Sequence, residues 1–597
     1  MEIKKKRSGM ELFIKILAIF GAVTLLSIVL LTIICFFKVS SHSKVPSKTV
    51  LEIDFADGLV EVRSDALVDR FSGREFLQIR GVVTALDRAA KDKRIKGIVA
   101  HIAGGPFQFA NVQEIRDAVL RFRTSGKFTE AFAETFGEMS SGNAAYYLAS
   151  AFDSISLQPS GTLGLTGFLL ESPFLKGTLE KLDIKPQLSG REEYKTARNV
   201  FTEERFTAAH REMSESISES VLEEFISDVA KVRKINKDTL RKLVSVGPFT
   251  AEQALSNRFV NKLEYRDQFY DRIRQKNGDK VSFLYLSKYV RSIRPVSNPK
   301  KTIALIYADG TIAQGQSRKN PMSGNTVLGA QTVAAAFRAA VRDPHVGAIV
   351  FRINSPGGSY IASDVIWRET VLARKAGKPI VATMGAVAGS GGYFVAMNAN
   401  KIIANPSTIT GSIGVVGGKF VNTGFFNKLG VTFDHVETDS NAIIWSPSME
   451  YTKGQLELIN RWLDTIYSDF VSKVATGRNI PLEQIKKLAK GRIYTGTEAL
   501  KLGLVDTLGG FAEAFATAKD LMGLPVEQSV GIKIFPKERP LWKRIFDRGP
   551  KSSEDMEFGS LVEQANLRKS ELMLFLPEIS IFFDQKGYLS MENVILR

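Results

Sequence analysis

The hydrophobic positions of the chain form two kinds of pattern. One is an uninterrupted apolar run, residues 16–37, which follows four basic residues at 4–7. The other, through the rest of the chain, is an alternation of short β-branched runs with stretches of helical periodicity. For example, residues 379–383 predict a strand and residues 392–399 a helix. Such alternation is typical of layered α/β domains.

The apolar run predicts a transmembrane helix. Its 22 residues carry no charge and at 1.5 Å per residue would extend about 33 Å, enough to cross a bilayer. No clear A-x-A cleavage site follows it, so we expect an uncleaved anchor, with a cleaved export signal as the alternative. Because basic residues before a span favour the cytoplasm, the body should lie on the extracytoplasmic side of a bacterial inner (plasma) membrane, crossed once.

The body of the chain repeats itself. Residues 146–182 align with residues 393–429 at a constant offset of 247 and without a gap, and residues 96–102 resemble residues 346–353. Self-similarity at a fixed period indicates duplicated architecture. We therefore expect four parts: a basic tip and anchor at 1–45, an N-terminal repeat at 46–295, a C-terminal repeat at 300–540 and a tail at 541–597.

Composition narrows the classes of function. The 597 residues are 44% hydrophobic and 24% charged, which excludes wholesale disorder. The single cysteine, Cys35, excludes intrachain disulfides and thiolate zinc clusters, and five histidines without an HExxH motif disfavour a zincin site. The net charge is +17, of which residues 1–48 supply +6 (eight Lys/Arg less two Glu). The rest is dispersed, so we expect no nucleic-acid binding.

The turn around Ser390 is the strongest candidate for chemistry. The sequence Ala-Gly-Ser-Gly-Gly at 388–392 follows a predicted strand and opens a predicted helix. Helix N–H groups there favour developing negative charge, and the glycines allow a peptide backbone to approach. The sequence is not G-x-S-x-G, which excludes an α/β-hydrolase. The alternative is a packing turn; a second serine, Ser141, lacks the glycine-rich surroundings.

A nucleophilic serine needs a base. The C-terminal repeat offers His345 and His435, but neither lies in a Gly- or Ser-rich turn, and the N-terminal repeat has Arg94 and Leu188 at the corresponding positions. We expect both histidines to be surface or packing residues. A lysine base then remains, and burial would have to lower its pKa toward neutrality.

Four motifs taken together resemble the signal peptide peptidase A family in its long, two-domain, membrane-anchored form. They are residues 352–358, the Ser390 turn, residues 406–414 and residues 193–197. The resemblance covers the anchor and both repeats. It implies a Clp protease/crotonase-like α/β spiral in each repeat. It also implies a Ser-Lys serine peptidase that degrades cleaved signal peptides, needs no metal or cofactor and assembles as a homotetramer of four separate sites.

The resemblance assigns roles to particular residues. Ser390 maps to the nucleophile, Lys195 to the base and Ser412 to the hydroxyl that orients the lysine. The oxyanion donors map to the backbone N–H groups of Gly358 and Gly391. Two small departures from the family pattern, Gly389 and Thr196, remove no reacting group.

The duplication bears on these roles independently. At the offset of 247, Ser390 corresponds to Asn143 and Lys195 to Ala442, while Ser412 corresponds to Leu165. Each repeat has therefore lost half of the dyad, and activity requires a dyad that bridges the repeats. Two alternatives are a non-catalytic membrane scaffold and a crotonase-type acyl-CoA enzyme; the export anchor and the lack of an acid in the Ser390 turn argue against the latter. We predict a serine endopeptidase acting on signal peptide remnants and other extended apolar peptides.

Overall fold

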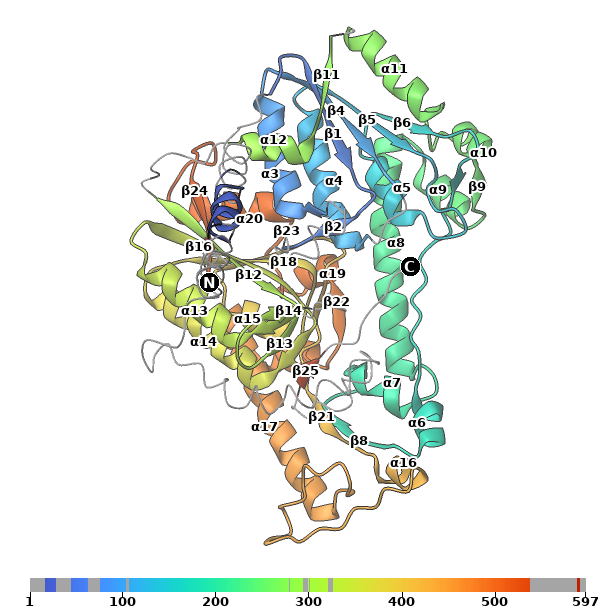
Figure 1. Cartoon of the computed structure of the whole chain (residues 1–597). Coiled ribbons are helices and arrows are strands. Elements are labelled where there is room, and N and C mark those ends of the chain that lie inside the picture. The colour runs from blue at the N-terminus through green and yellow to red at the C-terminus, as the bar shows by residue number, and fades with distance from the viewer. Residues whose placement is uncertain are drawn as a thin grey trace, which may run out of the picture.

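The structure, a computed structural model, describes most of both repeats (Figure 1). The described residues are 15, 17–27, 30, 45–62, 76–103, 107–278, 280–293, 299, 301–319, 326–536 and 588–590. Of the predicted anchor at 16–37, residues 17–27 and 30 are described and the others lie outside these ranges, and the predicted tail is described only at 588–590. Within the described residues, no helix is both long enough and apolar enough to span a bilayer.

A six-stranded parallel sheet forms the centre of the N-terminal repeat. In spatial order its strands are β10 (Lys262–Leu263), β6 (Ser154–Leu157), β5 (Phe128–Ala133), β4 (Ile95–His101), β1 (Thr49–Asp54) and β11 (Ser282–Tyr285). Two short ladders join β2 (Leu59–Val60) to β3 (Leu77–Gln78) and β7 (Thr162–Leu163) to β9 (Phe249–Thr250). The helices are α3 (Ile79–Lys91), α4 (Phe109–Arg123), α5 (Asn143–Ala149), α6 (Lys176–Leu182), α7 (Asn199–Thr202), α8 (Ala208–Arg233), α9 (Lys237–Val244), α10 (Ala251–Ser256), α11 (Arg266–Asn277) and α12 (Leu286–Ser292).

The C-terminal repeat contains an eight-stranded sheet with the same central order. Its strands are β23 (Thr507–Leu508), β19 (Lys401–Ala404), β18 (Ile380–Gly389), β16 (Val346–Ser355), β12 (Thr302–Asp309) and β24 (Gly531–Phe535), with β20 (Ile409–Gly411) and β22 (Ile493–Thr495) branching from β18. Its helices are α13 (Ala330–Arg342), α14 (Tyr360–Lys375), α15 (Gly391–Ala396), α16 (Thr423–Lys428), α17 (Lys453–Arg478), α18 (Leu482–Leu488), α19 (Gly496–Lys501) and α20 (Phe511–Leu521).

The duplication is visible element by element. The order β10-β6-β5-β4-β1-β11 reappears as β23-β19-β18-β16-β12-β24. The longest helices of the two repeats, α8 and α17, both have 26 residues and both end at a left-handed residue, Lys234 and Asn479. The predicted α/β class is therefore confirmed, with nearly continuous buried strands as expected for parallel sheets covered on both faces.

A third sheet connects the two repeats. Its spatial order is β14 (Arg318–Lys319), β15 (Thr326–Gly329), β13 (Thr311–Ala313), β17 (Gly357–Ser359), β25 (Tyr588–Ser590), β21 (Val416–Val421) and β8 (Lys185–Gly190). Strand β8 comes from the N-terminal repeat and pairs antiparallel with β21 of the C-terminal repeat over six residue pairs. Figure 1 shows these two strands side by side, close to α6 and α16.

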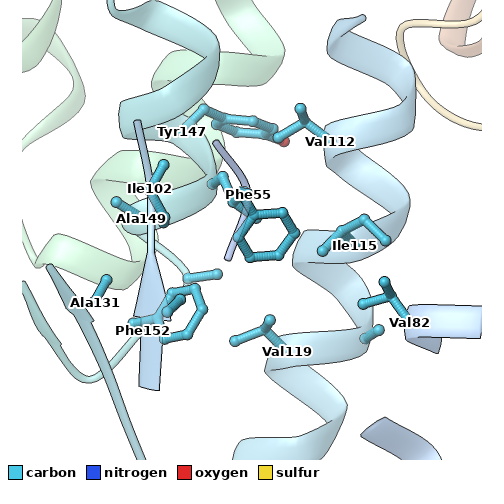
Figure 2. Packing of buried hydrophobic residues seen from close by; sticks show 14 of the residues in the cluster. Phe55, Val82, Ile102, Val112, Ile115, Val119, Ala131, Tyr147, Ala149 and Phe152 are labelled. Carbon is cyan, nitrogen blue, oxygen red and sulfur yellow. The ribbon is translucent and has the colours of Figure 1, made fainter. Parts of the chain in front are cut away.

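The hydrophobic core of the N-terminal repeat lies between its sheet and its helices. Figure 2 shows part of it, where Phe55, Ile115 and Phe152 pack together with the side chains of α4. All three side chains are fully buried. The same cluster extends into the C-terminal repeat through Leu305 and Phe511. The two repeats thus share one hydrophobic cluster and are packed directly against each other.

A buried ionic cluster also joins the repeats. The fully buried Arg352 guanidinium lies 2.8 Å from carboxylate oxygens of Glu61 and of Glu114, both in the N-terminal repeat. It also covers the Phe511 ring at 4.4 Å. The Phe511 backbone N–H donates to Glu114 at 2.6 Å. Burial raises the pKa of Glu61, and the neighbouring Arg352 guanidinium opposes that rise by favouring the charged carboxylate.

We expect Arg352→Met to destabilise the fold by about 3–5 kcal/mol, because removing one partner of a buried ion pair leaves uncompensated charge. The measurement is urea unfolding at neutral pH. The matched control is Arg274→Met, whose ion pair with Asp271 is exposed on both sides and is worth about 0–1 kcal/mol. Equal losses in the two variants would contradict a stabilising role for the Arg352 cluster.

Candidate active site

Ser390 occupies the sharp turn between β18 and α15. Its backbone φ is 53°, in the left-handed region that non-glycine residues rarely adopt. The Ser390 N–H donates to the Gly411 carbonyl at 2.8 Å, and the Phe394 N–H donates to the Ser390 carbonyl at 2.8 Å. Such strain costs about 1–3 kcal/mol and persists where surrounding contacts over-determine it. The serine is therefore held in one fixed orientation.

Lys195 reaches Ser390 from the other repeat. Its Nζ lies 2.8 Å from the Ser390 Oγ, 2.9 Å from the Ser412 Oγ and 3.0 Å from the Ser412 carbonyl oxygen. All three residues are buried, with at most 2% of their surface exposed. The structure thus brings together the three side chains that the sequence singled out, across 195 and 217 positions of the chain.

The surroundings of Lys195 favour its neutral form. Burial lowers the pKa of this amine from its usual 10.5 to about 7. The physical cause is desolvation, since the charged ammonium loses its water on entering the protein interior. No carboxylate contributes to the shift, so no opposite charge offsets the cost of charging the amine.

Two glycines of the C-terminal repeat close around Lys195. A Cβ at Gly491, where φ is 79°, would lie 2.5 Å from the Lys195 backbone nitrogen. A Cβ at Gly414 would lie 3.2 Å from Cδ of the same lysine. The sequence analysis did not identify Gly491, because its contact with Lys195 joins residues far apart in the chain. The neighbouring Lys490 carbonyl accepts a hydrogen bond from the Tyr194 N–H at 3.1 Å.

The β8–β21 ladder positions Lys195 beside Ser390 and Ser412. Lys195 follows β8 by five residues, and β8 is fixed in register by its pairing with β21, for example Gly190 with Val416. The Arg191 N–H then donates to the Val415 carbonyl at 3.0 Å. Ser412 is held separately, because its N–H donates to the Arg492 carbonyl at 2.7 Å.

The two glycines expected to bind an oxyanion lie next to each other beside Ser390. A Cβ at Gly391 would lie 3.2 Å from the Gly358 nitrogen and 2.7 Å from the Ser363 Oγ. Gly358 has a φ of 150°, and a Cβ there would lie 2.0 Å from the Ile312 carbonyl oxygen. A side chain at either position would clash, so the backbone at both glycines packs close to its neighbours beside Ser390.

An extended segment runs along this surface. Strand β25 pairs antiparallel with β17, with Leu589 opposite Gly358, and also with β21, where Tyr588 lies opposite Val416. The space between β17 and β21 therefore accommodates a segment in the β conformation, paired on both of its edges.

The other candidate residues lie away from this cluster. His345 and His435 are both exposed. Asn143 is buried in the N-terminal repeat, where its Nδ2 donates to the Ser141 Oγ at 2.9 Å and to the Gly167 carbonyl. Ala442 is exposed. Among the described residues, no group of three or more His, Cys, Asp or Glu side chains is arranged to hold a metal ion.

Comparison with known proteins supports a peptidase. Residues 135–280 and 372–525 match peptidase family S49. The chain is 34% identical to Protease 4 of Salmonella typhi, over 74% of this chain and 72% of that protein. It is 31% identical to Protease 4 of Haemophilus influenzae over the same shares, and 28% identical to the chloroplastic serine protease SPPA of Arabidopsis thaliana, over 78% and 69%.

Two solved structures are similar to part of the chain. A mutant of the membrane-bound stomatin-specific protease 1510-N is 15% identical, with a TM-score of 0.25, over 40% of this chain and 99% of that one. A mutant of ClpP1 from Listeria monocytogenes is 14% identical, with a TM-score of 0.23, over 35% and 93%.

We expect Lys195→Met to stabilise the protein at pH 7 but not near pH 10.5. Between these values the unfolded lysine binds a proton that the folded one does not, so stability rises with pH. A shift from 10.5 to about 7, at 1.36 kcal/mol per pKa unit, sets an upper limit of about 5 kcal/mol at pH 7.

Denaturant unfolding of both proteins from pH 7 to pH 10 measures this difference. It should shrink steadily as the pH rises, because methionine has no proton to lose. Lys490→Met is the control, since Lys490 is exposed and paired with Glu193. A difference independent of pH would show that Lys195 is charged in the folded state at neutral pH.

Proposed function

The chain belongs to peptidase family S49 and is a serine peptidase, and we propose that Ser390 and Lys195 form its catalytic dyad. The observation that carries this proposal is the buried amine 2.8 Å from the Ser390 Oγ, with a pKa lowered to about 7. We further propose that it degrades signal peptide remnants and other extended apolar peptides. The similarity to the two Protease 4 sequences supports this.

The hydrogen bonds around Lys195 fit a neutral amine. A neutral amine has two N–H donors and one lone pair. The Ser412 Oγ and carbonyl oxygen accept the two N–H bonds, which leaves the lone pair directed at the Ser390 hydroxyl. Ser412 thus orients the base, and Lys195 is ready to remove the proton of Ser390.

The reaction then follows in two steps. Ser390 Oγ adds to the peptide carbonyl carbon as Lys195 takes its proton, and the backbone N–H groups of Gly358 and Gly391 stabilise the negative oxygen. Lys195 next protonates the leaving amine as the C–N bond breaks. A water molecule, deprotonated by the same lysine, hydrolyses the acyl-enzyme and regenerates Ser390.

The substrate would bind as a β-strand between β17 and β21. Strand β25 already takes this position, antiparallel to both neighbours. Main-chain pairing selects extended peptides with little dependence on sequence. Folded proteins cannot present such a segment, which agrees with a role in degrading released peptides.

We also propose a single-pass anchor at residues 16–37, with the body on the extracytoplasmic side of the plasma membrane, and a homotetrameric assembly. The apolar run and the basic residues before it support the anchor and its orientation. The family resemblance supports the tetramer.

Ser390→Ala should abolish hydrolysis of an apolar peptide, by at least about 10³-fold in kcat, because it removes the nucleophile. Ser141→Ala is the matched control and should be nearly unchanged, since Ser141 is exposed in the N-terminal repeat. A fluorophosphonate should label Ser390, as located by mass spectrometry, and this label should be absent from Ser390→Ala and present in Ser141→Ala. If Ser390→Ala kept its activity and Ser141→Ala lost it, the nucleophile would lie in the N-terminal repeat and the proposed dyad would be wrong.

The pH dependence of kcat/KM should report the titration of Lys195. Only the neutral amine accepts a proton, so activity should rise with pH, about tenfold per unit below the pKa, and level off above about 7. Lys195→Arg should be inactive throughout, because guanidinium stays protonated. A profile still rising near pH 10.5 would contradict a desolvated base.

A further inference from the structure

The residues just before β22 hold Lys195 and Ser412 through their backbone. The Arg492 carbonyl accepts from the Ser412 N–H at 2.7 Å. Gly491, one residue earlier, packs closely against the Lys195 backbone. Figure 1 shows β22 next to α8 of the N-terminal repeat, and the two elements are in contact. This segment therefore contacts the proposed base and the serine that orients it, at the boundary between the repeats.

The side chain of Arg492 reaches across that boundary. Both of its terminal nitrogens donate to the Glu212 carboxylate of α8, Nη2 at 3.0 Å. Its guanidinium carbon lies 5.0 Å from the centroid of the Tyr194 ring, and Tyr194 directly precedes Lys195 in the chain. The arginine side chain is 17% exposed. A guanidinium suits this position, because its planar fork can bind a carboxylate bidentately and also stack on an aromatic face.

A second ring connects Arg492 to the nucleophile. The guanidinium carbon lies 5.8 Å from the centroid of the Tyr494 ring. That ring packs against Gly411, where a Cβ would lie 2.8 Å from Tyr494 Cδ2. The Gly411 carbonyl in turn accepts the Ser390 N–H at 2.8 Å. One cationic side chain therefore contacts the ring next to the base and the ring that packs against the support of the Ser390 turn.

The duplication provides an independent comparison. From α8 onward the two repeats correspond at an offset of 245, since the N-cap threonines of α8 and α17, and those of α10 and α19, are each 245 positions apart. The counterpart of Arg492 is then Gly247. This glycine packs against Leu165, the counterpart of Ser412, because a Cβ there would lie 1.9 Å from the Leu165 carbonyl oxygen. The N-terminal repeat thus keeps the close backbone approach and lacks the arginine side chain.

The neighbouring position differs in the same sense. Val246, 68% exposed, stands where Gly491 makes room for Lys195 in the C-terminal repeat. The repeat without the nucleophile and the orienting hydroxyl therefore also lacks the arginine and the glycine before it. A requirement of packing common to both repeats would apply to both of them. The distribution of these residues favours a role for Arg492 that is tied to the Lys195 site.

We propose that Arg492 is a positioning residue that holds Tyr194, and with it the adjacent base, against the C-terminal repeat. The Glu212 ion pair fixes the guanidinium, and the guanidinium fixes the ring. A buried amine stays neutral only while water is kept from it, so the same contacts preserve the low pKa of Lys195. This inference rests on the dyad proposed above and adds the residue that keeps the base in place.

The test is the pH profile of kcat/KM for an apolar peptide, measured from pH 5 to 9.5 on the full chain in detergent. Arg492→Ala should raise the midpoint above the value of about 7 by about one unit or more, because a loosened base becomes hydrated. The loss of activity should be about tenfold or more at pH 7, where the neutral fraction falls with the shift, and should nearly vanish at pH 9.5.

The charged partners of Arg492 do not titrate within that range. The hydrogen bond from Arg492 lowers the pKa of Glu212, so this carboxylate stays ionised, and arginine stays protonated. Burial raises the pKa of Tyr494 to about 12. A shifted midpoint would therefore report the base and not the surrounding groups.

Two further variants show whether Arg492 acts through Tyr194. Tyr194→Leu should reproduce the shift, and Arg492→Ala added to it should shift the midpoint little further, because residues acting as a unit are non-additive. Arg492→Lys keeps the charge beside Glu212 without the planar face, so we expect a smaller shift. KM should change by no more than about twofold, since the proposed substrate strand pairs with β17 and β21 and not with β22.

Arg274→Ala is the matched control. Arg274 makes the same two kinds of contact, an ion pair with Asp271 at 2.9 Å and a cation–π contact with Phe283 at 5.5 Å, but on α11 of the N-terminal repeat. Its profile should match that of the unmodified protein in both midpoint and height.

An equal loss of activity at every pH, with an unchanged midpoint, would show that Arg492 only supports the fold and would overturn the proposal. The midpoint does not depend on how much of a sample is folded, so a partly unfolded variant still decides the question. If Arg492→Ala yields no folded protein, unshifted midpoints in both Arg492→Lys and Tyr194→Leu overturn it. Absence of a transition near pH 7 in the unmodified protein would instead contradict the dyad itself, so the two failures are distinguishable.

Discussion

A primary amine must lose its water before it can serve as a base at neutral pH, and this requirement explains much of the structure. In the proposed dyad, Lys195 meets this requirement by entering the C-terminal repeat, where burial lowers its pKa to about 7. Two glycines leave room for its stem, and two atoms of Ser412 accept its N–H bonds. The β8–β21 ladder fixes the position of the backbone before Lys195, and this places the amine 2.8 Å from the Ser390 Oγ. A shift of one residue in that ladder would turn each side chain to the opposite face.

The duplication makes such burial possible. In a single repeat the end of the sheet would be open to solvent. In the two-repeat chain, the N-terminal repeat covers the end of the C-terminal sheet where Ser390 lies. The enclosure is held by apolar packing shared across the repeats and by Arg352, whose charge is balanced by two carboxylates from the other repeat. Replacing a buried ion cluster by apolar residues is often neutral for stability, so its value here lies more in fixing one arrangement of the repeats. A displaced Arg352 would move β16, the strand that leads directly to Gly358.

Much of this could be predicted from the sequence, for identifiable reasons. Local patterns located the β18 strand and the helix after Ser390, although the strand extends to Gly389, farther than residues 379–383, and the helix ends at Ala396. The constant offset showed that Ser390 and Lys195 each lack a counterpart in the other repeat. The pairing of β8 with β21, the glycine at 491 and the partners of Arg352 could not be predicted. These contacts join residues more than 200 positions apart, and no local periodicity records them.

Backbone conformation differs between the two repeats at the positions of Ser390 and Ser412. Ser390 and Ser412 both have left-handed backbones, with φ of 53° and 52°, which is costly for residues with a Cβ. Their counterparts in the N-terminal repeat, Asn143 and Leu165, do not have positive φ values, and Asn143 begins an ordinary helix. If the strain served packing alone, both repeats would be expected to keep it, since they share the order of their strands. At these two pairs of corresponding positions the strain is present only in the serines that contact Lys195, which indicates that the fold maintains it there for the orientation of their hydroxyl groups.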